Sequence, residues 1–286
     1  MINIFIPSNA VRLDTDMSKQ QIRLGIQGFP NSGKTWAALT FPNPIVLNLD
    51  RGLGAHQGRS DVVEIPFYKQ EVGGKREEVK EKLIIWLDNV ATKFTNEQTL
   101  IIDSCSAIEQ GYHAWYRKNE AALAAGEDGK FNKFIQWSLK ESFFGEIFST
   151  IKVLKCDVVF ITHESEMRDR PSSPGQLGQY SGKIRPLMTG KVTDTMCKDF
   201  TDWFRMLSCS KPTDFTKLDP IKTKHDWNMT VAEFKDMCDT YPRDTIYYWQ
   251  LSGDDIFDAK VSSLVDFPKY LPANYNSFKQ YMRKNK

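Results

Sequence analysis

The segment LGIQGFPNSGKTW, residues 24–36, matches the pattern G-x-x-x-x-G-K-[ST] without a substitution. An apolar run precedes the first glycine and a helical pattern follows the threonine, which is the strand-loop-helix setting that the pattern requires. In that setting the glycines let backbone N–H groups converge on an anion, and the helix N-terminus faces the same anion. The segment therefore predicts an α/β fold with a phosphate-binding loop.

Side-chain chemistry assigns roles within this loop. We expect Lys34 to reach the β- and γ-phosphates of a bound nucleotide and Thr35 to offer its hydroxyl to Mg²⁺. Trp36 either shields the nucleotide or packs the following helix, and the residue type alone leaves both roles open. The predicted nucleotide-binding set is Gly28, Phe29, Pro30, Asn31, Ser32, Gly33, Lys34, Thr35 and Trp36.

Short apolar runs alternate with longer helical patterns along the rest of the chain. This alternation predicts a mainly parallel twisted sheet flanked by helices, with antiparallel strands added at the C-terminal side. No clear linker divides the chain, so we expect one compact domain. It would comprise an N-terminal extension (1–19), a core (20–210) and a C-terminal sheet extension with a basic tail (211–286). The predicted strands are 2–6, 22–28, 44–50, 99–104, 157–164, 202–210 and 245–252, and the predicted helices are 34–41, 74–94, 133–155 and 187–200.

The charge balance excludes a broad electrostatic attraction to nucleic acid. The 286 residues carry a formal net charge of +2, so any nucleic-acid surface must be local. The five cysteines include no C-x-x-C pair, which indicates reduced thiols and argues against a zinc site. No window approaches the ~18 apolar residues of a membrane helix, and the first residues lack the basic start of a signal peptide. We therefore expect a cytoplasmic protein that does not insert into membranes.

Two of the predicted strands have an aspartate as their last or next-to-last residue. The run TLIID places Asp103 at the end of a buried strand, where open α/β sheets bind ligands, and we expect this carboxylate to hold the Mg²⁺ shell. The run PIVLNLD ends in Asp50, a candidate to polarise the water that attacks the γ-phosphate. Either acid has an alternative role, as a helix cap for Asp103 and a turn residue for Asp50.

A third buried strand, DVVFITHE, ends in His163 and Glu164. We expect His163 to touch the γ-phosphate and to pass a change of position on hydrolysis to the segment that follows. Glu164 is a competing candidate for the general base. The following residues 165–186 have no apolar period and are rich in glycine and proline, which predicts a long functional loop.

Seven segments, in order along the chain, resemble those of the RecA-like P-loop ATPases. Within this group it resembles the short phage-encoded relatives that carry only the recombinase core, some of which are described as single-strand annealing or recombination proteins. The segments with LDRGL and PLMTGK narrow the resemblance, because the other motifs are shared by many families. The matching segments are GFPNSGKT, IVLNLDRGLGAH, TLIIDSCSAI, VVFITHE, IRPLMTGKVTD, DWFRM and YYWQLS followed by DAKV.

The resemblance implies further roles for particular positions. Asp50 stands where the family has a catalytic glutamate, and His163 stands where it has a glutamine phosphate sensor. Residues 165–186 and 111–132 match the two DNA-facing loops. Lys260, in DAKV, resembles a position that reaches the nucleotide of an adjacent subunit. The family also implies ATP with Mg²⁺, a ring or filament of identical subunits, single-stranded DNA, and a single-strand DNA-binding protein as partner.

The residues of the 165–186 segment support DNA contact only in part. Four basic side chains would contact phosphates and one aromatic ring would stack on a base. Acidic residues at positions 164, 166 and 169 lie among them, so a solvated polar loop is an equal alternative. The candidates are Arg168, Arg170, Lys183 and Arg185 for phosphates and Tyr180 for stacking.

Three classes of function follow, in order of preference. The first is an ATP-hydrolysing recombination protein of a phage-infected bacterium, in which nucleotide state controls a DNA-facing loop. The second is an ATP-driven loader or assembly protein that acts on a protein partner without touching DNA, which the small net charge favours. The third is a small-molecule kinase, for which the sequence shows no acceptor-binding pattern.

Overall fold

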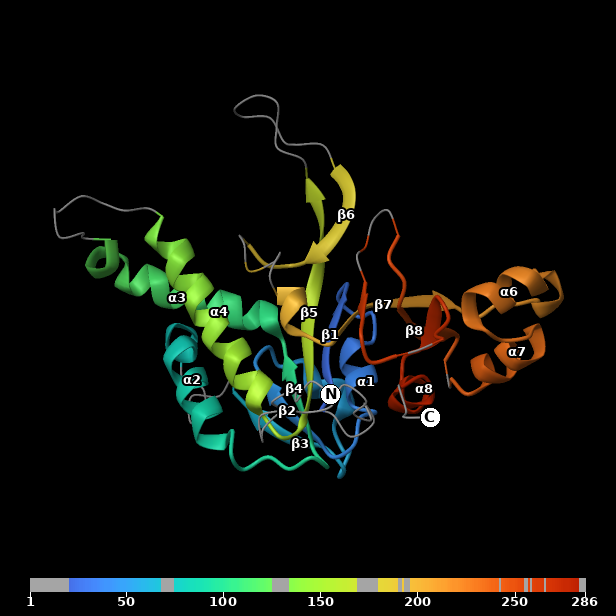
Figure 1. Ribbon diagram of the computed structural model, residues 1–286, viewed down its shortest axis with the longest axis horizontal. Coiled ribbons are helices and arrows are strands. Elements are labelled where there is room, and N and C mark those ends of the chain that lie inside the picture. Colours follow the sequence, from blue (N-terminus) through green and yellow to red (C-terminus); the bar gives the residue numbers. More distant parts are fainter. Residues whose placement is uncertain are drawn as a thin grey trace, which may run out of the picture.

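A mixed sheet forms the centre of the molecule in the computed structural model (Figure 1). The structure describes residues 21–67, 75–124, 134–168, 180–189, 192, 196–241, 243–254, 257, 259–264 and 266–282. The predicted strand over 2–6, Arg170 and the last four residues of the tail therefore lie outside the described part.

The strands of the sheet are β1 Arg23–Gly28, β2 Pro44–Asn48, β3 Val63–Pro66, β4 Thr99–Asp103, β5 Asp157–Arg168, β6 Tyr180–Pro186, β7 Asp202–Ser210, β8 Thr245–Gln250, β9 Lys260–Val261 and β10 Tyr270–Pro272.

The strand order is β10-β8-β7-β1-β5-β4-β2-β3, with β6 paired to β5 and β9 paired to β7. The strands from β7 to β3 in this order are parallel, whereas β8 and β10 add antiparallel pairs. Because β5 lies between β1 and β4, the carboxyl ends of β1, β5, β4 and β2 meet at one edge of the sheet. The predicted α/β fold with antiparallel C-terminal strands is confirmed.

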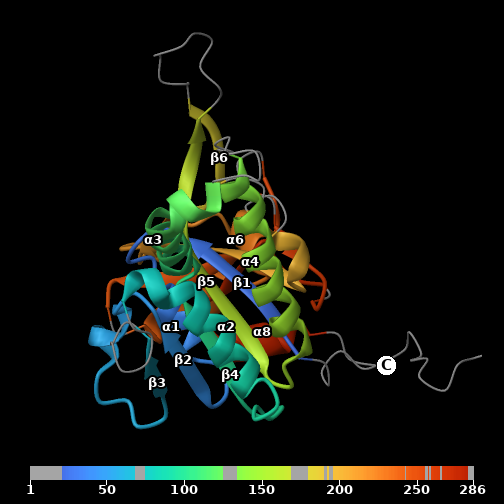
Figure 2. The ribbon, with the colours of Figure 1, turned by 90° about the vertical axis from the view of Figure 1, so that its left-hand side faces the viewer.

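Helices cover both faces of this sheet (Figure 2). Helices α2 (Val79–Val90), α3 (Cys105–Ala124) and α4 (Ile135–Val153) pack on one face, and α1 (Lys34–Ala38) and α8 (Tyr275–Gln280) pack on the other. Helices α6 (Pro220–Trp227) and α7 (Val231–Asp239) lie beyond β8 (Figure 1). Single turns of 3-10 helix are η2 Gly52–His56, η3 Arg76–Glu78, η4 Cys197–Asp199 and η5 Phe215–Lys217.

Strand β5 shows why the predicted strands are apolar almost throughout. Val158 and Phe160 contribute to the core under α2, α3 and α4, whereas Val159 and Ile161 contribute to the core under α1 and α8. All four side chains are at most 1% exposed. A strand covered on both faces has no polar side, so its sequence is a continuous apolar run.

The long loop expected over 165–186 is wrong where the structure describes it. Strand β5 continues to Arg168, and β6 returns antiparallel to it, with Ser165 opposite Arg185 and Glu166 opposite Ile184. Most of the glycines and prolines that suggested a loop fall in 169–179, outside the described residues. Polar side chains suit this pair of strands because it leaves the main sheet (Figure 1).

The DNA-facing loop expected over 111–132 is also wrong in its described part, because α3 runs to Ala124. Gly111, the first residue of that segment, lies where α3 contacts the start of α2. A Cβ atom there would lie 2.8 Å from Cβ of Val79, so the glycine permits close helix packing. A helix was expected over 187–200. The structure describes only part of this range, and the described part includes the 3-10 turn η4. None of the helices in the described ranges is long and apolar enough to cross a membrane.

Candidate active site

The phosphate-binding loop joins β1 to α1 in a backbone path that only small residues allow. A Cβ atom on Gly28 would lie 2.6 Å from Oγ of Ser32 and 2.9 Å from the carbonyl oxygen of Met206. Gly33 has a φ of 90°, and a Cβ atom there would lie 2.5 Å from the Tyr247 ring. The two glycines thus allow the loop to pack closely against Met206 and Tyr247. A side chain at either position would change the backbone path that surrounds the anion site.

Lys34 is buried in this cradle and is only 5% exposed. Its Nζ donates to the carbonyl oxygens of Gly28, at 2.9 Å, and Phe29, at 2.7 Å. Burial lowers the pKa of Lys34 to about 8, although the carboxylates of Asp103, Glu164 and Asp50 oppose the shift. An ammonium group that is desolvated and held only by carbonyls has a strong electrostatic preference for an incoming phosphate.

Thr35 and Asp103 meet across the floor of the site. Oγ1 of Thr35 donates to Oδ2 of Asp103 at 2.7 Å, and Asp103 is 4% exposed. Burial, reinforced by the charge of Asp50, raises the pKa of Asp103 to about 6. No group of three or more His, Cys, Asp and Glu side chains suited to a metal occurs among the described residues. One hydroxyl and one carboxylate fit Mg²⁺, which takes few protein ligands and completes its shell with phosphates and water.

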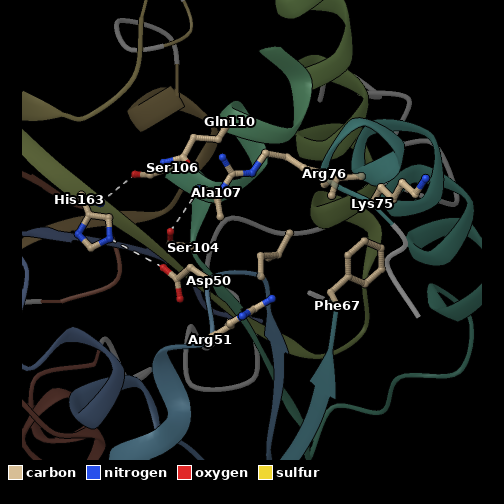
Figure 3. A pocket seen from close by; sticks show the side chains of 12 residues that line it. Asp50, Arg51, Phe67, Lys75, Arg76, Ser104, Ser106, Ala107, Gln110 and His163 are labelled. Carbon is tan, nitrogen blue, oxygen red and sulfur yellow. Dashed lines mark hydrogen bonds and ion pairs between the residues drawn. The ribbon is translucent and has the colours of Figure 1, made fainter. Parts of the chain in front are cut away.

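Asp50 and His163 face each other (Figure 3) and line the same pocket as Asp103. Nε2 of His163 lies 3.8 Å from Oδ2 of Asp50, and each side chain is 29% exposed. The polar contact with His163 lowers the pKa of Asp50, against the effect of burial, and the nearby Ser104 adds to the shift. Asp50 is therefore ionised at neutral pH. The buried Nδ1 of His163 has no hydrogen-bond partner within the structure described, as expected for a group that meets a ligand.

A pocket of about 650 Å³ joins these groups to the C-terminal part of the chain. Trp36 lines it and packs against Tyr247 and Tyr241, with ring centroids 5.7 and 5.9 Å apart. The two roles considered for Trp36 are thus compatible. The C-terminal lining of the pocket is not predicted from the sequence, in which the aromatic run TIYYWQ indicates only a strand. That lining is Tyr241, Arg243, Thr245 and Tyr247.

Glu164 does not line this pocket. It is 4% exposed and accepts from Arg205, with Nε 3.1 Å from Oε2 and Nη2 3.0 Å from Oε1. Nε2 of Gln27 lies 3.5 Å from the same carboxylate. Neighbouring residues of a strand point to opposite faces, so Glu164 and His163 serve different sides of the sheet. This geometry favours Asp50 over Glu164 as the candidate base.

Four of the five DNA-contact candidates lie on the β5–β6 hairpin. Arg168 ends β5 and pairs with Tyr180 of β6, and β6 also contains Lys183 and Arg185. Figures 1 and 2 show this hairpin extending well beyond the layers of helices. The fold thus brings these positions together on one projecting element.

Lys260 lies away from the nucleotide pocket. It begins β9 opposite Trp203, and its Nζ donates to the carbonyl oxygens of Lys198, at 2.9 Å, and Phe200. It lines a separate hollow with Arg23, which begins β1, at the other end from the phosphate-binding loop. Lys260 therefore does not act in its own subunit's pocket, and its contact with a neighbouring subunit stays a prediction.

Comparisons with known proteins give a family match and many distant structural likenesses, two of which are described here. The model of the AAA domain family matches residues 20–205. The RadB recombinase structure is 11% identical with a TM-score of 0.33, covering 66% of this chain and 76% of its own. The flagellar accessory protein FlaH from Methanocaldococcus jannaschii is 12% identical with a TM-score of 0.31, covering 71% and 79%. No curated protein matches the sequence.

Proposed function

Because the chain belongs to the AAA domain family and is a P-loop ATPase with a RecA-like core, we propose that it couples Mg²⁺-dependent ATP hydrolysis to the handling of single-stranded DNA. The observation that carries this proposal is the continuity of β5. The strand has His163 at the nucleotide pocket and continues into the hairpin with the basic DNA-contact candidates. Recombination or single-strand annealing in a phage-infected cell, with a single-strand DNA-binding protein as partner, fits this arrangement.

The residues of the pocket have different roles in the proposed hydrolysis. Lys34 and the loop amides would bind the phosphates, and Thr35 and Asp103 would hold Mg²⁺, which would neutralise phosphate charge. Asp50 is ionised and orients the attacking water by accepting its hydrogen bond. The aromatic end of the pocket at Trp36, Tyr241 and Tyr247 offers ring faces to the nucleobase.

His163 links the pocket to the hairpin through the backbone. Its carbonyl accepts from the N–H of Leu187, at 2.6 Å, immediately after β6, and its N–H donates to Oγ of Ser106, at 3.3 Å. Arg168 is five positions further along β5, or about 17 Å in an extended strand. A shift of His163 on loss of the γ-phosphate would therefore move both strands of the hairpin together.

DNA binding and assembly complete the proposal. The basic positions of the hairpin contact DNA phosphates, and Tyr180 stacks on a base. A head-to-tail ring or filament of identical subunits would carry Lys260 toward the nucleotide of a neighbour. Its position at the opposite end of β1 from the phosphate-binding loop suits a contact between subunits rather than within one.

The test is the steady-state ATPase rate with and without single-stranded DNA, read together with DNA binding in ATP and in ADP. We expect DNA to stimulate turnover and ATP to strengthen DNA binding. Arg185→Ala should weaken both effects, whereas Lys217→Ala, on the distant turn η5, should change neither. Failure of DNA to change turnover, together with nucleotide-independent DNA binding, would contradict the coupling.

The loader or assembly function is the second candidate, and the net charge of +2 favours it. In that case the hairpin would contact a protein partner. An ATPase that ignores DNA but retains a stoichiometric protein partner only in its ATP state would replace the first proposal with this one.

A further inference from the structure

A second cavity, of about 820 Å³, lies on the far side of Asp50 and His163 from the nucleotide pocket (Figure 3). Of the residues that the structure describes, only these two line both hollows, so their side chains form the partition between them. The other described lining residues of the second cavity come from the segments after β2 and β3, the starts of η3 and α2, and the first turns of α3. Apart from Asp50 and His163, none of its described lining residues has a role in the proposed hydrolysis.

The lining of this cavity is basic and rich in donors. Arg51 and Arg76 direct their guanidinium groups toward it, whereas Lys75 points away from it (Figure 3). The hydroxyls of Ser104 and Ser106 lie at its edge near the partition. Gln110 adds an amide, and among the described lining residues Asp50, which faces His163, is the only one with a carboxylate.

We propose that this cavity binds a tetrahedral phosphate anion next to the γ-phosphate position. Guanidinium groups bind phosphate oxygens through paired N–H donors, and serine hydroxyls add donors of the same geometry. The N-terminus of α3, a helix of 20 residues, directs its partial positive charge into the same hollow. The arrangement therefore matches a phosphate ion in both charge and donor count.

Two sources supply this chemistry. One is the inorganic phosphate that hydrolysis releases, which would pass the Asp50–His163 partition, and this source rests on the proposed ATPase reaction. The other is a phosphate group of an external polynucleotide that enters from solvent. The binding chemistry is the same for both, so the site is tested first with inorganic phosphate alone.

The neighbouring residues Arg76 and Lys75 provide a matched pair of variants. Inorganic phosphate is titrated by calorimetry into protein saturated with Mg²⁺ and ADP, which occupies the phosphate-binding loop. Loss of a charged hydrogen-bond partner should raise the Kd of Arg76→Gln about tenfold, with the Kd of Lys75→Gln nearly unchanged. Arg76→Lys should restore part of the affinity. Equal affinity in Arg76→Gln and Lys75→Gln, whether both are weakened or neither, would overturn the proposal.

The source is identified with two further measurements on the same proteins. A fluorescent phosphate sensor should report slower phosphate release than wild type in Arg76→Gln but not in Lys75→Gln if the released ion uses the cavity. If a short single-stranded oligonucleotide displaces inorganic phosphate instead, the external source is supported. The calorimetric titration requires no hydrolysis and no DNA, so the cavity can bind phosphate even if the coupling of ATPase to DNA fails.

Discussion

Two groups of buried charges, one in the nucleotide pocket and one near the base of the hairpin, are paired to different extents. In the nucleotide pocket, Lys34 has only carbonyl partners, Asp103 accepts from one hydroxyl, and Nδ1 of His163 has no partner in the described structure. In the second group, Lys140 of α4 and Glu109 of α3 form an ion pair with each other, and both also hydrogen-bond to Thr189. The difference separates charges arranged for a ligand from charges that hold the fold together.

The Lys140–Glu109 pair binds the segment after β6 to helices α3 and α4 through hydrogen bonds to Thr189. Lys140 is 1% exposed, and its Nζ donates to Oε1 of Glu109, at 2.8 Å, and to Oγ1 and the carbonyl oxygen of Thr189. The same Glu109 oxygen accepts from the backbone N–H of Thr189, at 2.8 Å, and from its hydroxyl, at 2.7 Å. These contacts fix one end of the hairpin, so that a movement of His163 would act against an anchored point.

Removal of Lys140 should give the largest effect on stability. Lys140→Met leaves Glu109 buried without its cation, which should lower the free energy of unfolding by about 3–5 kcal/mol. Urea denaturation measures this loss. Lys152→Met, which removes a half-exposed partner of Asp199, should cost at most about 1 kcal/mol. If the Lys140 variant is as stable as the Lys152 variant, the structural role of the buried pair is wrong.

Removal of the Asp50 charge should affect turnover instead of stability. Asp50→Asn should slow hydrolysis about 100-fold, because the amide no longer accepts the proton of the attacking water, while nucleotide affinity changes little. Single-turnover kinetics and nucleotide titration separate the two quantities. Glu164→Gln should mainly lower stability, because it weakens the buried contact with Arg205. Normal hydrolysis by Asp50→Asn would make Glu164 the next candidate for the base.

The incomplete pairing of Lys34 predicts a pH dependence of nucleotide binding. Its pKa in the nucleotide-free protein is lowered to about 8, and a bound polyanion favours the charged form. Above about pH 8, binding must therefore take up a proton, so affinity should fall by up to about tenfold per pH unit. Calorimetric titrations at several pH values test this. Lys34→Arg keeps its charge, and a decline in its affinity of the same steepness would exclude Lys34 as the cause.

The smallest effect is expected on the hairpin. Arg185→Ala should weaken binding of single-stranded DNA severalfold and reduce the slope of log affinity against log salt by about 0.7, the value for one phosphate contact. Fluorescence anisotropy at several salt concentrations gives both quantities. Lys217→Ala is the control for net charge. Identical salt slopes for the two variants would show that position 185 makes no phosphate contact.

The sequence predicted those parts of the site that depend on local pattern. The loop at Gly28–Thr35 has a spacing that few other structures require, and Asp50, Asp103 and His163 each end an apolar run. The C-terminal wall at Tyr247 could not be predicted, because it depends on a contact between residues more than 200 positions apart. Lys140 was also beyond prediction, since a lysine in a helical pattern is usually exposed.

Hydrogen exchange of the hairpin amides tests most directly whether nucleotide state reaches it through β5. Exchange is followed in residues 164–168 and 180–187 with Mg²⁺ and either a non-hydrolysable ATP analogue or ADP, in the wild type and in His163→Ala. Transmission through His163 predicts that the wild-type amides differ in protection between the two nucleotides, and that the difference disappears in the variant. Equal protection in both nucleotide states of the wild type would contradict the coupling.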